Sequence, residues 1–189
     1  MMNIVFGGSF NPPTVAHFEM IQIIKASFNI DRFIIVPVGD HYKFKHVISA
    51  EHRFAMLDLM AEELGVEVSR IEMDAPGFQG TYQTLQQLAL PNTKFLLGSD
   101  NLVQLSRWLN AEKLLSDYGI IVIRRQQDIE AIIEADPLLT KYKHHIEIIN
   151  HFDVPVSSTA YRQFKDEQYV NESVANYIQH HQLYEEEHE

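Results

Sequence analysis

The chain has no cysteine, so no disulfide holds it together. It needs none, because a domain of this length should bury roughly 70% of the surface that its unfolded chain exposes. The lack of cysteine fits a reducing compartment, although many exported proteins lack it too. No apolar run approaches the roughly 20 residues of a membrane helix, and MMNIVFGG does not resemble a signal peptide. We therefore expect a soluble, cytoplasmic protein.

Positive charge is also scarce. Fifteen Lys and Arg stand against 26 Asp and Glu, which gives a net charge of -11. We expect no binding to nucleic acid or to an anionic membrane, and any phosphate site must gather its few cations locally. The spacing of the clustered histidines matches no zinc site, so no metal ligands are predicted. The oligomeric state stays open, with a homo-oligomer as one alternative. The clustered histidines are His144, His145, His151, His180 and His181.

Short apolar runs alternate with longer amphipathic ones along the chain. Several of the short runs are apolar throughout, as in strands that helices cover on both faces. This alternation predicts an α/β fold with a doubly wound, mostly parallel sheet. We expect one domain over 1–189, with a small C-terminal helical part from about residue 157. Strands are predicted at 3–6, 32–38, 66–73, 94–97, 119–124 and 145–149. Helices are predicted at 15–28, 50–61 (capped by Ser49), 81–90, 101–115, 129–139 and 170–184.

The turn after the first strand, residues 7–17 (GGSFNPPTVAH), has features of a phosphate site. Two glycines allow a ligand to approach the backbone closely. Thr14 and His17 lie three residues apart where the next helix begins, so both can face one point near its N-terminus. The segment is neither a Walker A loop nor a GxGxxG turn, which argues against a P-loop kinase and a dinucleotide dehydrogenase.

Residues 7–17 resemble the signature of the HIGH-type nucleotidyltransferase superfamily, Gly-Ser/Thr-Phe-Asn/Asp-Pro followed by His/Thr-x-Gly-His, with Ala16 in place of the usual glycine. Residues 156–162 (VSSTAYR) resemble the Ile-Ser-Ser-Thr-x-Ile-Arg motif of nicotinate/nicotinamide mononucleotide adenylyltransferases. Residues 97–108, from Leu-Gly-Ser-Asp to the single Trp, resemble the Gly-x-Asp-x-Leu…Trp segment of that family. Further resemblances cover 49–57, 80–85, 121–125 and 174–184, nearly the whole chain in total.

The resemblance implies a Rossmann-like nucleotidyltransferase that joins ATP to nicotinate or nicotinamide mononucleotide, giving a dinucleotide and pyrophosphate in NAD biosynthesis. An acceptor phosphate oxygen attacks the α-phosphorus in line, so no protein nucleophile is needed, and Mg²⁺ binds through the ATP phosphates. The catalytic residues that the resemblance implies are His17, Thr14 and Arg162. The ATP-binding residues that it implies are Gly7, Gly8, Ser9, Phe10, His17, Gly98, Asp100, Arg124, Ser157, Ser158, Thr159 and Arg162. The acceptor-binding residues that it implies are Asn11, Lys43, Lys45, Thr81 and Trp108.

Two alternatives stay open. One is a related transferase with another phosphate acceptor, such as phosphopantetheine. The other is a nucleotide-binding paralogue with little turnover, which Ala16 and the segment 39–46 favour, because that segment lacks the family's Pro-Pro-His-Lys. The sequence does not distinguish a nicotinate from a nicotinamide acceptor.

Overall fold

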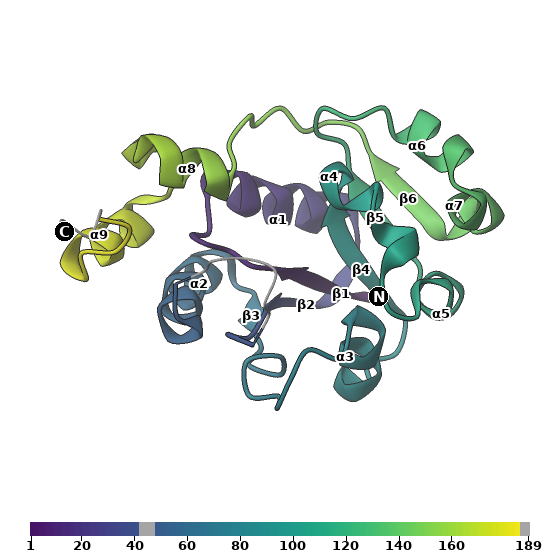
Figure 1. Cartoon of the computed structure of the whole chain (residues 1–189), viewed down its shortest axis with the longest axis horizontal. Helices are drawn as coiled ribbons and strands as arrows, with labels where there is room; N and C mark the ends of the chain where they lie inside the picture. Colours follow the sequence, from purple (N-terminus) through teal and green to yellow (C-terminus); the bar gives the residue numbers. More distant parts are fainter. Residues whose placement is uncertain (42–47, 186–189) are drawn as a thin grey trace.

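The computed structural model describes residues 1–41 and 48–185. Six strands form one parallel sheet in the order β3-β2-β1-β4-β5-β6 (Figure 1). This is the strand order of the Rossmann fold, and it confirms the predicted fold class. The strands are β1 Met2–Gly8, β2 Ile30–Pro37, β3 Glu67–Val68, β4 Thr93–Gly98, β5 Ile120–Ile123 and β6 Ile146–Ile149.

Helices follow most of the strands. The α-helices are α1 Val15–Ser27, α2 Ala50–Leu64, α3 Thr81–Leu88, α4 Ser99–Leu102, α5 Ala111–Asp117, α6 Ile129–Ala135, α7 Pro137–Lys141, α8 Ser158–Phe164 and α9 Glu172–His180. The 3-10 helices are η1 Leu105–Arg107, η2 Lys143–His145 and η3 Glu167–Tyr169. In the described parts of the chain, no helix is both long and apolar enough to cross a bilayer.

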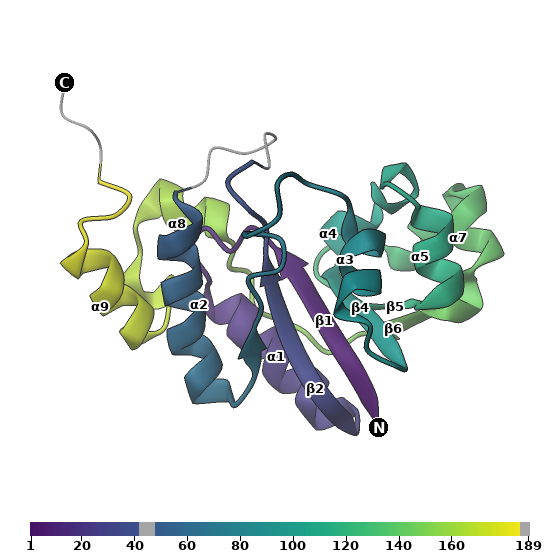
Figure 2. The same cartoon turned by 90° about the horizontal axis from the view of Figure 1, so that it is seen from below.

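The side chains of the sheet alternate between two cores, as strand geometry requires. Ile4 and Phe6 of β1 pack with α1 and α2, whereas Val5 between them packs with α3 and α5. Figure 2 shows α1 and α3 on opposite sides of the strands β1 and β2. The continuously apolar strands are therefore covered on both faces, as the sequence predicts.

The C-terminal helices form a third core against α2. In Figure 1, α8 lies above α2 and α9 lies to the left of it. Met56 of α2 packs there with Tyr161 of α8 and with Val174 and Ile178 of α9. Helix α2 is thus held between the sheet, through Leu57 and neighbouring side chains, and the C-terminal part of the chain.

Four predicted elements are wrong in extent. The predicted strand 66–73 is only β3, because the chain turns where the backbone N–H of Asp74 bonds to the carbonyl of Arg70 (2.9 Å). The predicted helix 101–115 is α4, η1 and α5, since the chain takes a left-handed conformation at Asn110 (φ 57°). The predicted helix 129–139 divides into α6 and α7, where Asp136 caps the new helix and Pro137 begins it. The final helix is also shorter than predicted.

Candidate functional site

The carboxyl ends of β1 and β4 meet at the centre of the sheet. The chain continues from β1 into α1 on one face and from β4 into α4 on the other. This is the point where the strand order reverses, and ligands of open α/β sheets bind in the crevice at such points. Gly98 ends β4 here, and a Cβ atom on it would lie 2.5 Å from Oδ1 of Asp100. A side chain at position 98 would therefore meet the Asp100 carboxylate, which would have to move.

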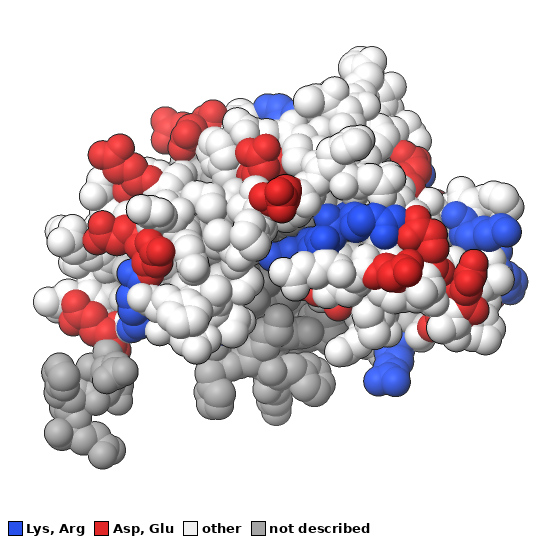
Figure 3. Space-filling model, turned by 90° about the horizontal axis from the view of Figure 1, so that it is seen from above, with Lys and Arg blue, Asp and Glu red and all other residues white. Residues whose placement is uncertain are grey.

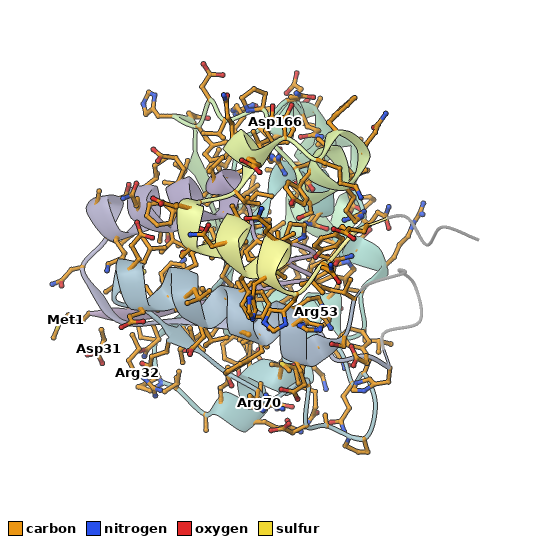
Figure 4. The ribbon with its side chains drawn as sticks, turned by 90° about the vertical axis from the view of Figure 1, so that its left-hand side faces the viewer. Met1, Asp31, Arg32, Arg53, Arg70 and Asp166 are labelled. Atoms are coloured by element: carbon orange, nitrogen blue, oxygen red, sulfur yellow. The ribbon has the colours of Figure 1, made fainter. Side chains whose placement is uncertain are left out.

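The loop after β1 is held from one side by Arg53 of α2. This side chain is fully buried, and Figure 4 shows it on α2 beside α9. Its Nη1 donates to the Ser9 carbonyl and its Nε to the Ile48 carbonyl, both at 3.0 Å, and its Nη2 donates to Oδ1 of Asp40 at 3.1 Å. Burial lowers the pKa of Arg53, but a guanidinium stays charged in proteins. Arg53 was not among the predicted site residues.

Helix α8 holds the same loop from the other side. The hydroxyl of Ser158 donates to the Pro12 carbonyl (2.8 Å), and Nη1 of Arg162 donates to the Asn11 carbonyl (2.6 Å). Ser157 caps the helix by accepting from the backbone N–H of residue 160 (3.1 Å). The structure therefore joins the two sequence motifs, which lie about 150 residues apart, by direct hydrogen bonds. Nη2 of Arg162 also donates to Thr159 (3.3 Å).

His17 lies one turn into α1 with a defined ring orientation. Its Nδ1 accepts from the backbone N–H of Thr14 (3.0 Å) and lies 2.9 Å from the Thr14 hydroxyl. The ring also packs against Phe10, with 5.1 Å between the ring centroids. Burial, with the charge of Arg125 as a second cause, lowers the pKa of His17 to about 3. At neutral pH the imidazole is therefore uncharged, and because Nδ1 accepts, its proton lies on Nε2.

A cavity of about 210 Å³ opens beside Asp100. Arg125 lines it, with Nη2 donating to the Val156 carbonyl (2.7 Å) and Nη1 lying 3.8 Å from Oδ1 of Asp100. The backbone of Arg125 is held by Ser99, whose hydroxyl accepts from its N–H (3.0 Å). Figure 3 looks onto the side of the linker between β6 and α8 and shows a band of basic side chains in a hollow with acidic side chains around it. The remaining lining residues are Gln126, Gln127, Phe152, Asp153, Val154, Pro155 and Ser157.

The structure places Arg124 outside this cavity. Its Nε donates to Asn150 (2.7 Å), and its Nη2 pairs with Glu130 (2.6 Å). The neighbouring Arg125 lines the cavity instead. It lies in a bend two residues after the end of β5, so the alternation of strand side chains does not predict it.

Two of the predicted acceptor residues, Thr81 and Trp108, lie in neighbouring segments on the α3 side. Trp108 packs its ring against Phe95 of β4, with 6.0 Å between centroids, and a Cβ on Gly7 would touch that same phenyl ring. Gly80, which precedes Thr81 at the start of α3, lies directly against Leu109, the residue after Trp108. Lys43 and Lys45 lie outside the described residues, so their predicted roles stay predictions.

A half-buried carboxyl group lies near these segments. The hydroxyl of Thr84 in α3 donates to Glu72 (2.7 Å), and burial raises the pKa of Glu72. The carbonyl oxygen of Glu72 lies close to Gly39, two residues after the end of β2. A Cβ atom on Gly39 would lie 2.6 Å from this oxygen. The segment 69–80 therefore contacts the chain just after β2 and leads into the start of α3. Within 1–41 and 48–185, no group of three or more His, Asp or Glu residues is arranged to hold a metal ion.

Comparison with known proteins gives consistent matches. Residues 5–164 match the cytidylyltransferase-like family. A probable nicotinate-nucleotide adenylyltransferase of Acholeplasma laidlawii (strain PG-8A) is 35% identical over 98% of this chain and 98% of its own length. A nicotinamide/nicotinic acid mononucleotide adenylyltransferase of Oryza sativa subsp. japonica is 31% identical over 97% of this chain and 86% of its own.

A solved structure supports the fold. The Plasmodium falciparum nicotinic acid mononucleotide adenylyltransferase complexed with NaAD superposes with a TM-score of 0.79. The superposition covers 97% of this chain and 98% of that one, at 23% identity. At this identity the likeness establishes the shared fold.

Proposed function

We propose that this chain, which belongs to the cytidylyltransferase-like family, transfers the adenylyl group of ATP to nicotinate or nicotinamide mononucleotide, forming the dinucleotide and pyrophosphate. Relatives that match it over nearly their full length carry names for this activity. The observation that carries the proposal is the neutral, oriented imidazole of His17 at the reversal point of the sheet, beside the charge of Arg125.

In the proposed reaction, an oxygen of the acceptor phosphate attacks the α-phosphorus of ATP in line, and pyrophosphate leaves. The acceptor phosphate is already a nucleophile, so the protein has to orient the two substrates and stabilise charge on the phosphates. Nε2–H of His17 donates to an α-phosphate oxygen. It does so without first losing its own hydration, because it is already held in a partly buried site. Thr14 supports this role by occupying Nδ1.

The triphosphate lies, in this proposal, between the turn after β1 and the start of α8. Ser157, Thr159 and Arg162 contribute hydroxyls and charge, and Arg125 replaces the predicted Arg124. The position of Arg125 on the cavity wall supports this exchange, because Arg124 is already paired with Glu130. Gly98 and Asp100 face the nucleoside, where the carboxylate can accept hydrogen bonds from ribose hydroxyls.

Magnesium enters this site as part of the substrate. The described residues offer no cluster that could hold a metal ion by themselves, so we expect Mg²⁺ to arrive bound to the ATP phosphates. Bound there, it neutralises phosphate charge. The protein residues then act on the phosphate oxygens that remain accessible.

The acceptor binds, in this proposal, on the α3 side of the sheet. Trp108 offers an aromatic face or edge to the pyridine ring, and Thr81 offers a hydroxyl. Asn11, in the loop after β1, is the third described residue that we assign to the acceptor. We also expect the chain to work in the cytoplasm, as the sequence predicts.

The decisive assay is release of pyrophosphate from ATP and Mg²⁺ with three acceptors at equal concentration. These are nicotinate mononucleotide, nicotinamide mononucleotide and phosphopantetheine. Turnover with a pyridine nucleotide is the expected result, and the ratio of the two kcat/KM values decides between acid and amide. Turnover with phosphopantetheine alone would show that the acceptor is phosphopantetheine and not a pyridine mononucleotide. ATP binding without turnover would indicate a nucleotide-binding paralogue.

A further inference from the structure

The backbone hydrogen bonds of the sheet end just before Arg125. The last of them at the end of β5 joins the N–H of Arg124 to the carbonyl of Ile149 (2.9 Å). Arg125 follows in a bend, and its own N–H donates to the hydroxyl of Ser99 (3.0 Å). Ser99 is the first residue of α4, directly after β4, and it is fully buried. A side chain at the end of β4 therefore binds the first backbone donor that follows β5.

Gln127 contacts the same hydroxyl. Its Oε1 lies 2.6 Å from Oγ of Ser99 and also accepts from the backbone N–H of Gln126 (3.3 Å). A backbone N–H can only donate, so the amide atom at this point is the oxygen. The Ser99 hydroxyl accepts from Arg125 and donates its own proton to Gln127. A hydroxyl that donates becomes a stronger acceptor, so each of these two bonds strengthens the other.

The side chain of Arg125 is held along its length. Its Nη2 donates to the Val156 carbonyl (2.7 Å), and its Nη1 lies 3.8 Å from Oδ1 of Asp100. A Cβ atom on Gly98 would lie 3.3 Å from Cδ of Arg125, so the aliphatic part of this side chain passes over the end of β4. Arg125 reaches these partners on the cavity wall only from the backbone position that Ser99 holds.

We propose that Ser99 and Gln127 are positioning residues, which hold the backbone of Arg125 at the end of β4 so that its guanidinium faces the cavity. The inference rests on the proposed function, in which Arg125 binds ATP, and deepens it. It gives the first turn of α4 and the bend after β5 a joint task in ATP binding. Gln127 also lines the cavity, so the tests must separate an action through Arg125 from a direct contact with ATP.

The main test measures the KM for ATP in Ser99→Ala and Gln127→Leu. Ser99→Ala removes the acceptor for the Arg125 N–H, and Gln127→Leu removes the acceptor for the Ser99 hydroxyl with little change in volume. In each variant we expect the KM for ATP to rise about fivefold, as loss of one hydrogen bond allows. The KM for the mononucleotide should stay nearly unchanged. An unchanged KM for ATP, or an equal rise of both KM values, would overturn the proposal.

Two variants at exposed positions serve as controls. Ser116→Ala removes a hydroxyl of α5 that donates to the Lys113 carbonyl (3.3 Å), and Gln86→Leu removes an amide of α3 that donates to the Tyr82 hydroxyl (3.2 Å). Both should leave the KM for ATP nearly unchanged. A rise in the controls as large as that in Ser99→Ala and Gln127→Leu would overturn the proposal, because it would show a general response to a lost hydrogen bond.

A double-mutant cycle tests whether the two residues act through Arg125. In an Arg125→Ala background, neither Ser99→Ala nor Gln127→Leu should raise the KM for ATP further. A further rise with Gln127→Leu would show that Gln127 contacts ATP directly, and it would overturn the proposal.

One measurement does not depend on turnover. The backbone N–H of Arg125 should exchange with solvent faster in Ser99→Ala and in Gln127→Leu than in the wild-type protein, and at the wild-type rate in both controls. Unchanged exchange in Ser99→Ala would overturn the proposal even if the enzyme is active. If the wild-type protein binds ATP without turnover, the proposed transfer fails, and the Kd for ATP from calorimetry replaces its KM in the same comparisons.

Discussion

The backbone N–H of Thr14 donates to Nδ1 of His17 at 3.0 Å, and this bond sets the chemistry of the site. It assigns the single proton of the neutral ring to Nε2, so the histidine is a hydrogen-bond donor and not a base. Because the donor is a main-chain group at the first turn of α1, substitution of the Thr14 side chain leaves it in place.

His17→Ala should lower kcat by about 10² to 10³, the typical effect of removing one preorganised donor from a transition state. His17→Gln should retain part of the rate, since its amide NH₂ can reach toward the position of Nε2. His144→Ala, at an exposed histidine remote from the motif, is the matched control. Steady-state kinetics with circular dichroism to verify folding checks this. An undiminished rate in folded His17→Ala would remove His17 from the mechanism.

The imidazole of His17 should not titrate between pH 5 and pH 8. Its pKa is lowered to about 3 in the folded protein and is 6.5 without the fold. The unfolded chain therefore binds this proton first, so the contribution of His17 to stability is complete above pH 6.5 and is lost as the pH falls toward 3. Long-range ¹H–¹⁵N spectra should show the Nε2–H tautomer throughout the range. A midpoint near 6.5 would contradict the prediction.

The variants Arg125→Ala and Arg124→Ala change adjacent residues and should differ in their effect on the KM for ATP. Arg125→Ala should raise the KM for ATP by about tenfold or more, because it removes a charged donor from the cavity wall. Arg124→Ala removes a solvent-accessible pair with Glu130 and should change the KM by about twofold at most. The pKa of His17 should rise in Arg125→Ala, since the charge that helps to lower it is gone. The reverse ranking of the two KM values would restore Arg124 to the site.

Arg53→Ala should destabilise the protein by about 1 to 3 kcal/mol for each buried carbonyl that it leaves without a donor. It leaves the carbonyls of Ser9 and Ile48 without their donor. Arg70→Ala is the control, because Arg70 forms exposed ion pairs from a nearby position, and it should cost about 1 kcal/mol or less. Urea unfolding curves measure both. Equal losses would mean that Arg53 does not hold the loop.

Trp108 is the only tryptophan of the chain, so its emission reports on one position. Adding nicotinate mononucleotide should quench or shift this emission if the pyridine ring lies against the indole. Phosphopantetheine, which carries no aromatic ring, serves as the comparison ligand and should have little effect. No change on saturation with a turned-over pyridine nucleotide would place the acceptor elsewhere.

The sequence predicts an element correctly where the residues that determine this element are contiguous along the chain. The strands β1, β4 and β5 are apolar runs with flanking breaks, and the sequence predicts each to within a few residues. The segment 66–73 is equally strand-like in sequence, but the strand ends after Val68 and the chain turns at 70–74, where Arg70 also pairs with Glu51 of α2. Local periodicity contains no information on this contact with α2.

Some residues of the candidate site were likewise predictable from the sequence, and others were not. The motif residues 7–17 and 156–162 were found from the sequence, and the structure bonds them directly through Ser158 and Arg162. Arg53 was missed although it lies in a segment that resembled the family. Its role appears only when its guanidinium is buried against main-chain carbonyls from two other segments.

The sequence by itself determined the class of the fold, the position of the glycine-containing turn after β1 and the family. These depend on periodicity and on motifs that are contiguous along the chain. Only the tertiary structure decided which of two adjacent arginines faces the cavity, which nitrogen of His17 carries the proton, and that α8 bonds to the loop after β1. Each of these depends on burial and on partners from distant segments, and such contacts form only when the sheet and the C-terminal helices pack together.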